Sequence, residues 1–145
     1  REVVRRRTAG DPLRTSDDLV ACMSRVLGRS PKGTEKARVF QALRIAVNRE
    51  LEGLHEALPR LRDALRPTGT LAVIAYHSLE DRIVKNSFRE WSASCVCPPD
   101  LPVCRCRGVA LGTTLTRKPV RPADAEVDRN PRARSALLRA WRKAA

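Results

Sequence analysis

An imidazole, two carboxylates and a guanidinium fall within one short segment, His77-Ser78-Leu79-Glu80-Asp81-Arg82. The segment follows a continuous apolar run at 71–76, which is typical of a buried central strand of a parallel sheet. In open α/β sheets, ligands bind at the carboxyl ends of the strands, where the N-termini of helices converge. Because His77 comes at such a strand end, we expect its ring to face a ligand-binding rim and not the core.

The two acids of this segment also have a purely structural interpretation. Ser78 can cap a helix, and Asp81 stands three residues later, which is the spacing of a capping box. Carboxylates in a first helical turn also interact favourably with the positive end of the helix dipole. Glu80 and Asp81 could therefore serve the helix alone, and the sequence leaves both interpretations open.

A stretch of 12 residues that contains prolines holds four cysteines, Cys95, Cys97, Cys104 and Cys106. Four thiolates suit tetrahedral zinc, although the one-residue gaps are shorter than the usual spacing of two to four. The alternative is a set of reduced thiols in a loop. Without a secretory signal we expect no disulfide framework, so the choice is between a structural metal and free thiols.

The net charge of +13, carried mainly by arginine, favours a polyanionic partner, although the same charges could simply solvate the surface. One candidate contact surface is a polar helical stripe formed by Gln41, Arg44 and Asn48. The other is the segment 130–135 (NPRARS) with Arg139 beyond it, in which two arginines follow an Asn-Pro turn and suit phosphate. No apolar run is long enough to span a bilayer, so we expect a cytoplasmic protein with no membrane partner.

Periodicity and capping signals give an order of elements that would position these groups. We expect no regular element before residue 15, then a helix that starts at Thr15 to Asp18 and stops at Gly28. An amphipathic helical stretch at 39–65 follows, whose apolar stripe is core, with a kink or break near Leu58 caused by Pro59.

The remaining expectations are a strand at 71–76, a helix at 78–91, a loop at 95–107, a strand within 109–120, a polar connection at 121–134, and a strand or short helix at 136–141. The inner face of the helix at 78–91 would be formed by Leu79, Ile83, Val84, Phe88 and Trp91.

Three segments together resemble the bacterial 16S rRNA cytosine-N4 methyltransferases. They are residues 38–48 (RVFQALRIAVN), 71–85 (LAVIAYHSLEDRIVK) and 130–139 (NPRARSALLR). Their order and spacing match as well as their content, from about Thr15 to the C-terminus. The chain also starts at Arg1 within a charged stretch, so we interpret it as the C-terminal portion of such an enzyme.

The resemblance implies an α/β protein with a partial Rossmann-like methyltransferase fold. Its last three strands and their helices would be present, preceded by the end of a helical insertion. Residues 1–37 would end that insertion, and residues 38–145 would form the C-terminal half of the Rossmann-like domain. The strand at 71–76 would be followed by strands in the 110s and at 136–142 as an antiparallel edge, which favours strand for the last segment. With half of the sheet missing, we expect an exposed edge at 71–76.

The implied activity is S-adenosylmethionine-dependent methylation of the exocyclic N4 amine of a cytidine in 16S ribosomal RNA. The Gly-rich loop that binds this cofactor in the family has no counterpart among the isolated glycines here. We therefore expect the cofactor site mostly outside this chain, no cofactor-binding residue within it, and a fragment that is inactive alone.

For the reaction, we expect His77 to contact the amine or accept its proton, with Asp81 behind it. The residues expected to hold RNA are Arg44, Asn48, Arg82, Asn130, Arg132 and Arg134. Two alternatives stay open. The chain could be a non-enzymatic basic RNA-binding module in which the four cysteines form a zinc knuckle, or a remnant that pairs with another chain.

Overall fold

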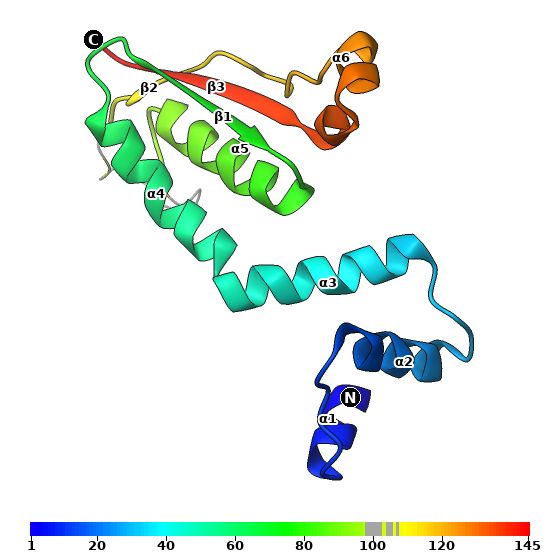
Figure 1. The fold of residues 1–145 in the computed structure, drawn as a ribbon. Helices are drawn as coiled ribbons and strands as arrows, with labels where there is room; N and C mark the ends of the chain where they lie inside the picture. Colours follow the sequence, from blue (N-terminus) through cyan, green and yellow to red (C-terminus); the bar gives the residue numbers. More distant parts are fainter. Residues whose placement is uncertain (98–102, 104–105, 107) are drawn as a thin grey trace. The chain divides into compact units, whose positions relative to one another are not determined.

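The computed structural model describes residues 1–97, 103, 106 and 108–145, and these form two compact units, Arg1–Arg49 and Glu50–Ala145 (Figure 1). We call them the first and the second unit. Their boundary falls after Arg49, whereas the assignment of residues 1–37 to a helical insertion stays a prediction.

The first unit holds three helices, α1 (Glu2–Thr8), α2 (Ser16–Leu27) and α3 (Gly33–Asn48). The prediction for α2 is confirmed: the Thr15 side chain accepts from the Asp18 backbone N–H at 3.1 Å, and Gly28 ends the helix in the left-handed conformation with φ of 67°. Helix α1 was not predicted, because its sequence has no apolar period. Its acidic first turn and basic last turn agree instead with the helix dipole.

The amphipathic stretch at 39–65 forms two helices, α3 and α4 (Glu50–Ala64), so the helix is interrupted at Arg49 and the predicted alternative of a break near Leu58 is wrong. Arg49, with φ of 52°, ends α3 in the left-handed conformation, while α4 continues through Pro59. Pro59 has no backbone N–H to donate and crowds the preceding turn, but its neighbour Leu58 is completely buried, and this packing favours a continuous α4.

The predicted apolar stripe is core only in part of α4, at Leu54 and Leu58, and just after it at Leu65, while Leu61 is 49% exposed. In α3 the stripe is not core, since this helix has no buried residue and Val47 is 79% exposed.

The second unit contains a mixed α/β arrangement in which the described residues form a three-stranded antiparallel sheet. Its strands are β1 (Thr70–Ala75), β2 (Gly112–Thr114) and β3 (Leu137–Lys143), in the order β1-β3-β2. Because β1 and β2 both pair antiparallel with β3, they run in the same direction. The prediction of a strand at the C-terminal segment is confirmed.

Strand β1 differs from the central, doubly buried strand that its apolar run predicted. Its described hydrogen-bonded partner is antiparallel, it lies at the edge of the described sheet, and exposed residues alternate with more buried ones along it. The reason is that α5 (Ser78–Ser92) covers one face of the sheet, while Ile74, on the other face, is 53% exposed (Figure 1). The expectation of an exposed edge at β1 is confirmed for the described residues.

The core lies between α4, α5 and the sheet. It consists of Leu58, Val84, Phe88, Trp91 and Trp141, all at most 3% exposed. Trp141 lies 5.3 Å from Trp91 and 6.4 Å from Phe88 between ring centroids. The predicted inner face of α5 is confirmed at its three buried positions but is wrong at Leu79, which is 41% exposed.

Strand β2 passes so close to β3 that Gly112 has no room for a side chain. A Cβ atom at this position would overlap the Arg142 backbone oxygen and the indole ring of Trp141. The Trp141 indole N–H also donates to Ser92 Oγ at 3.1 Å, and Ser92 Oγ lies 2.9 Å from the Thr114 hydroxyl. The polar edge of the buried indole is thereby satisfied.

The segment at 121–134, predicted as an irregular connection, contains α6 (Asp124–Arg129) and the short 3-10 helix η1 (Pro131–Ser135). Both are too short for periodicity to reveal them. Elsewhere, the predicted strand within 109–120 is shorter than expected, with β2 and one further bridge between Val120 and Leu138. Across the described residues, no helix has the length and apolar character needed to cross a membrane.

Candidate functional site

His77 ends the turn between β1 and α5 and caps the helix. Its Nδ1 accepts the backbone N–H of Glu80 at 3.3 Å, and the Glu80 carboxylate accepts the backbone N–H groups of Tyr76 at 2.9 Å and His77 at 3.3 Å. This capping box replaces the predicted pair of Ser78 and Asp81. The cap falls one residue earlier because the extended backbone of β1 continues through His77, whose φ is −145°.

The second imidazole nitrogen of His77 faces the same carboxylate. Nε2 lies 3.1 Å from Glu80 Oε1, but the two atoms lack the alignment of a hydrogen bond, and among the described residues Nε2 is buried without such a partner. Because Nδ1 accepts a backbone N–H, the neutral ring carries its proton on Nε2. The geometry thus presents a buried N–H beside a carboxylate.

Glu50, the first residue of α4, joins this group. Ligand atoms of Glu50, His77 and Glu80 lie within 4.8 Å of one another, and all three residues are half-buried. We call them the polar cluster. One imidazole and two carboxylates at such distances can share and relay a proton or hold a positively polarised N–H group. Sequence reasoning missed Glu50, because its sequence position gives no sign that it would meet the end of β1.

Asp81 points to the sheet. Its two carboxylate oxygens accept from Arg139 Nε at 2.6 Å and from Arg139 Nη2 at 3.0 Å, and the two side chains are only 16% and 8% exposed. Arg139, which lies beyond the predicted phosphate-binding segment at 130–135, is therefore a buried partner of Asp81. Its in-phase spacing with the buried Trp141 along β3 was the signal for this inward direction.

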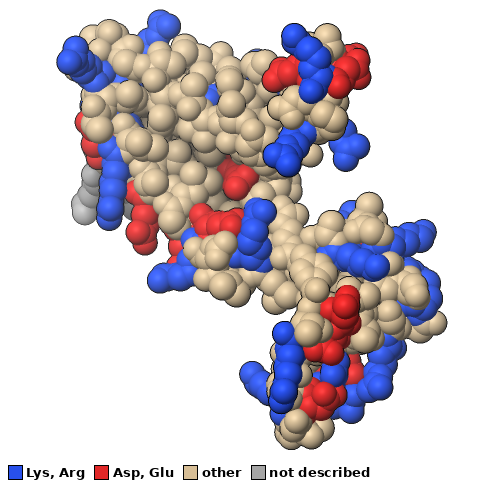
Figure 2. Space-filling model, in the orientation of Figure 1, with Lys and Arg blue, Asp and Glu red and all other residues tan. Residues whose placement is uncertain are grey.

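The predicted RNA-binding residues of the second unit lie on two elements. Arg82 is exposed in the first turns of α5, and Arg132 and Arg134 are exposed on η1. The Asn130 side chain accepts the backbone N–H of Arg132 at 3.3 Å and so caps η1. On the face drawn in Figure 2, basic atoms near α6 and η1 alternate with acidic atoms, which weakens the local attraction for phosphate.

Arg44 and Asn48 belong to the first unit. Both are exposed on α3. Their contact with RNA stays a prediction.

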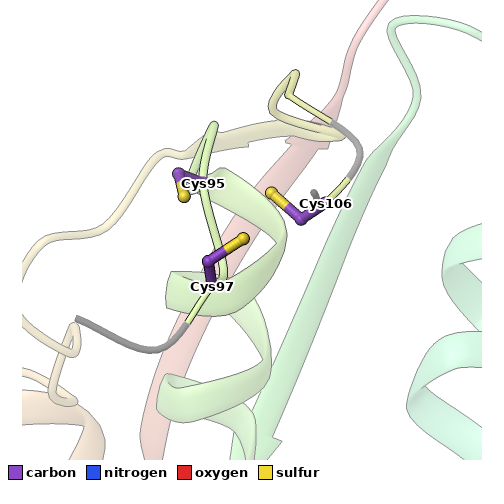
Figure 3. A group of neighbouring side chains, drawn as sticks. All are labelled: Cys95, Cys97 and Cys106. Carbon is purple, nitrogen blue, oxygen red and sulfur yellow. The ribbon is translucent and has the colours of Figure 1, made fainter. Parts of the chain in front are cut away.

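Three of the four clustered cysteines are among the residues that the structure describes, and their thiols lie close together. The sulfur atoms of Cys95, Cys97 and Cys106 lie within 4.8 Å of one another, and the close-up shows them directed into the same space (Figure 3). Cys104, the fourth predicted ligand, lies outside the described residues. The remaining cysteine, Cys22, is buried in α2 of the first unit.

The MraW methylase family model matches residues 1–144 of the chain. Three similar curated proteins are each called ribosomal RNA small subunit methyltransferase H. The protein of Gemmatimonas aurantiaca is 61% identical over 144 residues, which cover 99% of this chain and 45% of that protein. The proteins of Heliobacterium mobile and Symbiobacterium thermophilum are 50% and 51% identical over 97% and 89% of this chain, and the chain covers 46% and 42% of their lengths. The chain thus spans less than half the length of these relatives.

Proposed function

The chain belongs to the MraW methylase family, and on that premise we propose that it is part of an enzyme that methylates the N4 amine of a cytidine in 16S ribosomal RNA, with S-adenosylmethionine as methyl donor. The observation that carries this proposal is the polar cluster at the carboxyl end of β1, where ligands bind in α/β proteins. The common direction of β1 and β2 supports a Rossmann-like domain that the rest of the protein completes.

The described residues of this chain do not fit S-adenosylmethionine as a complete site. The turn after β1, Tyr76-His77-Ser78, has no glycine that would let the backbone approach an adenosine, and its N–H groups at Tyr76 and His77 are already bonded to Glu80. We propose that the cofactor, which supplies the electrophilic methyl group, is held chiefly outside this chain.

The polar cluster suits the chemistry of an exocyclic amine. The N4 lone pair of cytosine is delocalised into the ring, so hydrogen bonds that accept from the amine increase its nucleophilicity, and its proton must leave after transfer. The carboxylates of Glu80 and Glu50 can accept such bonds. His77 can accept the amine proton at Nε2 in the tautomer that carries its own proton on Nδ1, a change that gives up the hydrogen bond from the Glu80 N–H. The resulting imidazolium would lie beside the Glu80 carboxylate, whose Oε1 is 3.1 Å from Nε2.

Asp81 is proposed as a positioning residue. Its bidentate pair with Arg139 ties the first turn of α5 to β3 and so fixes the direction of the His77 ring. The RNA backbone would meet Arg82, Arg132 and Arg134, while Asn130 shapes the turn before η1, and Arg44 and Asn48 would extend the contact. A ribosomal substrate places this activity in the cytoplasm.

A chimaeric enzyme tests the proposal. The matching 45% of the Gemmatimonas aurantiaca protein is replaced by this chain, and single-turnover methylation of unmodified small ribosomal subunits is measured. We expect N4-methylcytidine by nucleoside mass spectrometry, and a His77→Ala loss of about 10²- to 10⁴-fold, the usual contribution of an acid–base group.

The matched control is His55→Ala, which removes the chain's other histidine, exposed on α4. Its rate should stay within about threefold of the unsubstituted chimaera, well inside the usual acid–base effect. A methyl group on another atom would overturn the N4 assignment. A His77→Ala rate within the same threefold range would remove His77 from the chemistry.

A further inference from the structure

The loop that follows α5 brings three thiols to one point. Cys95 and Cys97 follow the end of the helix at Ser92, and Cys106 comes from the segment that leads to β2. In Figure 3 the sulfur atoms of Cys95, Cys97 and Cys106 are all directed into the space between the three residues. Cysteines on both sides of the loop therefore bring their sulfur atoms close together. Apolar packing alone would not require this arrangement of the thiols.

The spacing of these sulfur atoms suits a tetrahedral thiolate site. With Zn–S bonds of about 2.3 Å, ligand sulfurs in a tetrahedron lie about 3.8 Å apart. The three sulfurs lie within 4.8 Å of one another, so adjustments of side-chain torsion angles are enough to reach that distance. The one-residue gap between Cys95 and Cys97 is thus compatible with binding to one ion.

The backbone around the group already orients one sulfur. The Val96 N–H donates to Cys106 Sγ at 3.4 Å, so a residue between two of the thiols holds the third. Backbone N–H groups that point at cysteine sulfur stabilise the thiolate, the form in which cysteine binds metals. The net charge of +13 also favours anionic sulfur.

We propose that Cys95, Cys97 and Cys106 bind one Zn²⁺ ion as thiolates, with water or a further donor completing the coordination. Each thiol releases its proton to solvent as its Zn–S bond forms. The ion would close the loop between α5 and β2 and hold both beside the core, where the Leu111 N–H donates to the Trp91 backbone oxygen at 2.8 Å. Its role would be structural, and it is independent of methyl transfer.

Metal content of the 145-residue chain tests the site directly. The chain is expressed with added zinc, purified under a phosphine reductant, and analysed by mass spectrometry for bound metal. We expect about one zinc ion per chain, because the three thiols converge on a single site. Variant Cys95→Ser/Cys97→Ser/Cys106→Ser should lose it, whereas Cys22→Ser, which removes the buried thiol of α2, should keep it. No zinc in the unsubstituted chain, or equal zinc in the triple variant, would overturn the proposal.

A second measurement needs no substitution and so does not depend on how the variants fold. Alkylation of each cysteine by N-ethylmaleimide is followed by peptide mass spectrometry with zinc, with magnesium and with a chelator. Zinc should slow the labelling of Cys95, Cys97 and Cys106 at least tenfold, the chelator should reverse this, and magnesium should not protect, because thiolates select soft ions. Equal labelling rates with zinc and chelator, or a disulfide between two of these residues in the reduced protein, would contradict the site.

Discussion

The two units of this chain are stabilised in different ways. The second unit has an aromatic core in which Trp141 is completely buried, whereas in the first unit, whose residues are all described, only Leu19, Cys22 and Pro31 are buried. The first unit relies instead on exposed ion pairs: Glu2 with Arg5, Arg6 with Asp11, and Arg29 with Glu35. Since exposed pairs stabilise weakly, the second unit should account for most of the chain's resistance to unfolding.

Removing the central aromatic ring should show this contrast most strongly. Trp141→Ala creates a cavity beside Phe88 and Trp91 and leaves Ser92 without its indole donor, so we expect the free energy of unfolding to fall by about 3–5 kcal/mol. Val47→Ala, at a residue of α3 that is 79% exposed, should change it by less than about 0.5 kcal/mol. Urea unfolding followed by Trp91 fluorescence measures the first effect, and circular dichroism the second. Similar losses in both variants would remove the contrast.

Breaking an ion pair should also destabilise the second unit more than the first, but the difference in the free energy of unfolding should be smaller than that for the aromatic core. Asp81→Asn leaves the buried guanidinium of Arg139 without its carboxylate, and we expect a loss of about 2–3 kcal/mol in urea unfolding. Asp11→Asn, which breaks the exposed pair with Arg6 in the first unit, should leave the unfolding midpoint unchanged. An equal shift for the two variants would show that burial does not govern these pairs.

The smallest effect concerns acid stability of the first unit. The hydrogen bond from Arg5 lowers the pKa of Glu2 from 4.5 to about 2, and that from Arg29 lowers the pKa of Glu35 to about 2. A lowered pKa stabilises the fold fully above 4.5, and this contribution is lost as the pH falls toward 2. Circular dichroism should therefore show a modest loss of helix over this range, and the double variant Glu2→Gln/Glu35→Gln should show a flatter profile. Identical profiles would assign the acid sensitivity to other groups.

Features set by neighbouring residues could be predicted from the sequence, and features set by distant ones could not. Thr15, Asp18 and Gly28 define α2 through local hydrogen bonds and a left-handed residue, and the structure confirms them. The apolar stripe at 39–65 correctly indicated helix, but periodicity cannot say what covers a face, so the exposure of Val47 was not foreseen. The break at Arg49 likewise has no local signal comparable to the proline at 59.

In the candidate site, too, only the features set by neighbouring residues could be predicted from the sequence. The place of His77 at a strand end followed from the order of elements, whereas its role as helix cap depended on how far the extended backbone continued. Asp81 and Arg139 lie 58 residues apart, and Glu50 meets His77 only through the packing of α4. Such pairings are decided by tertiary structure, which residue spacing alone does not reveal.

The strand order has a consequence for synthesis on the ribosome. β3 lies between β1 and β2 in the sheet but follows both of them in the chain, and it supplies Trp141 and Arg139 to the core and to α5. Until residues 137–143 have been made, the described sheet lacks its middle strand, and the inner faces of α4 and α5 are not covered by β3. Exposed apolar surface in such a nascent chain binds chaperones and promotes aggregation. Translation speed ahead of residue 137 would therefore affect the yield of folded protein more than its final stability.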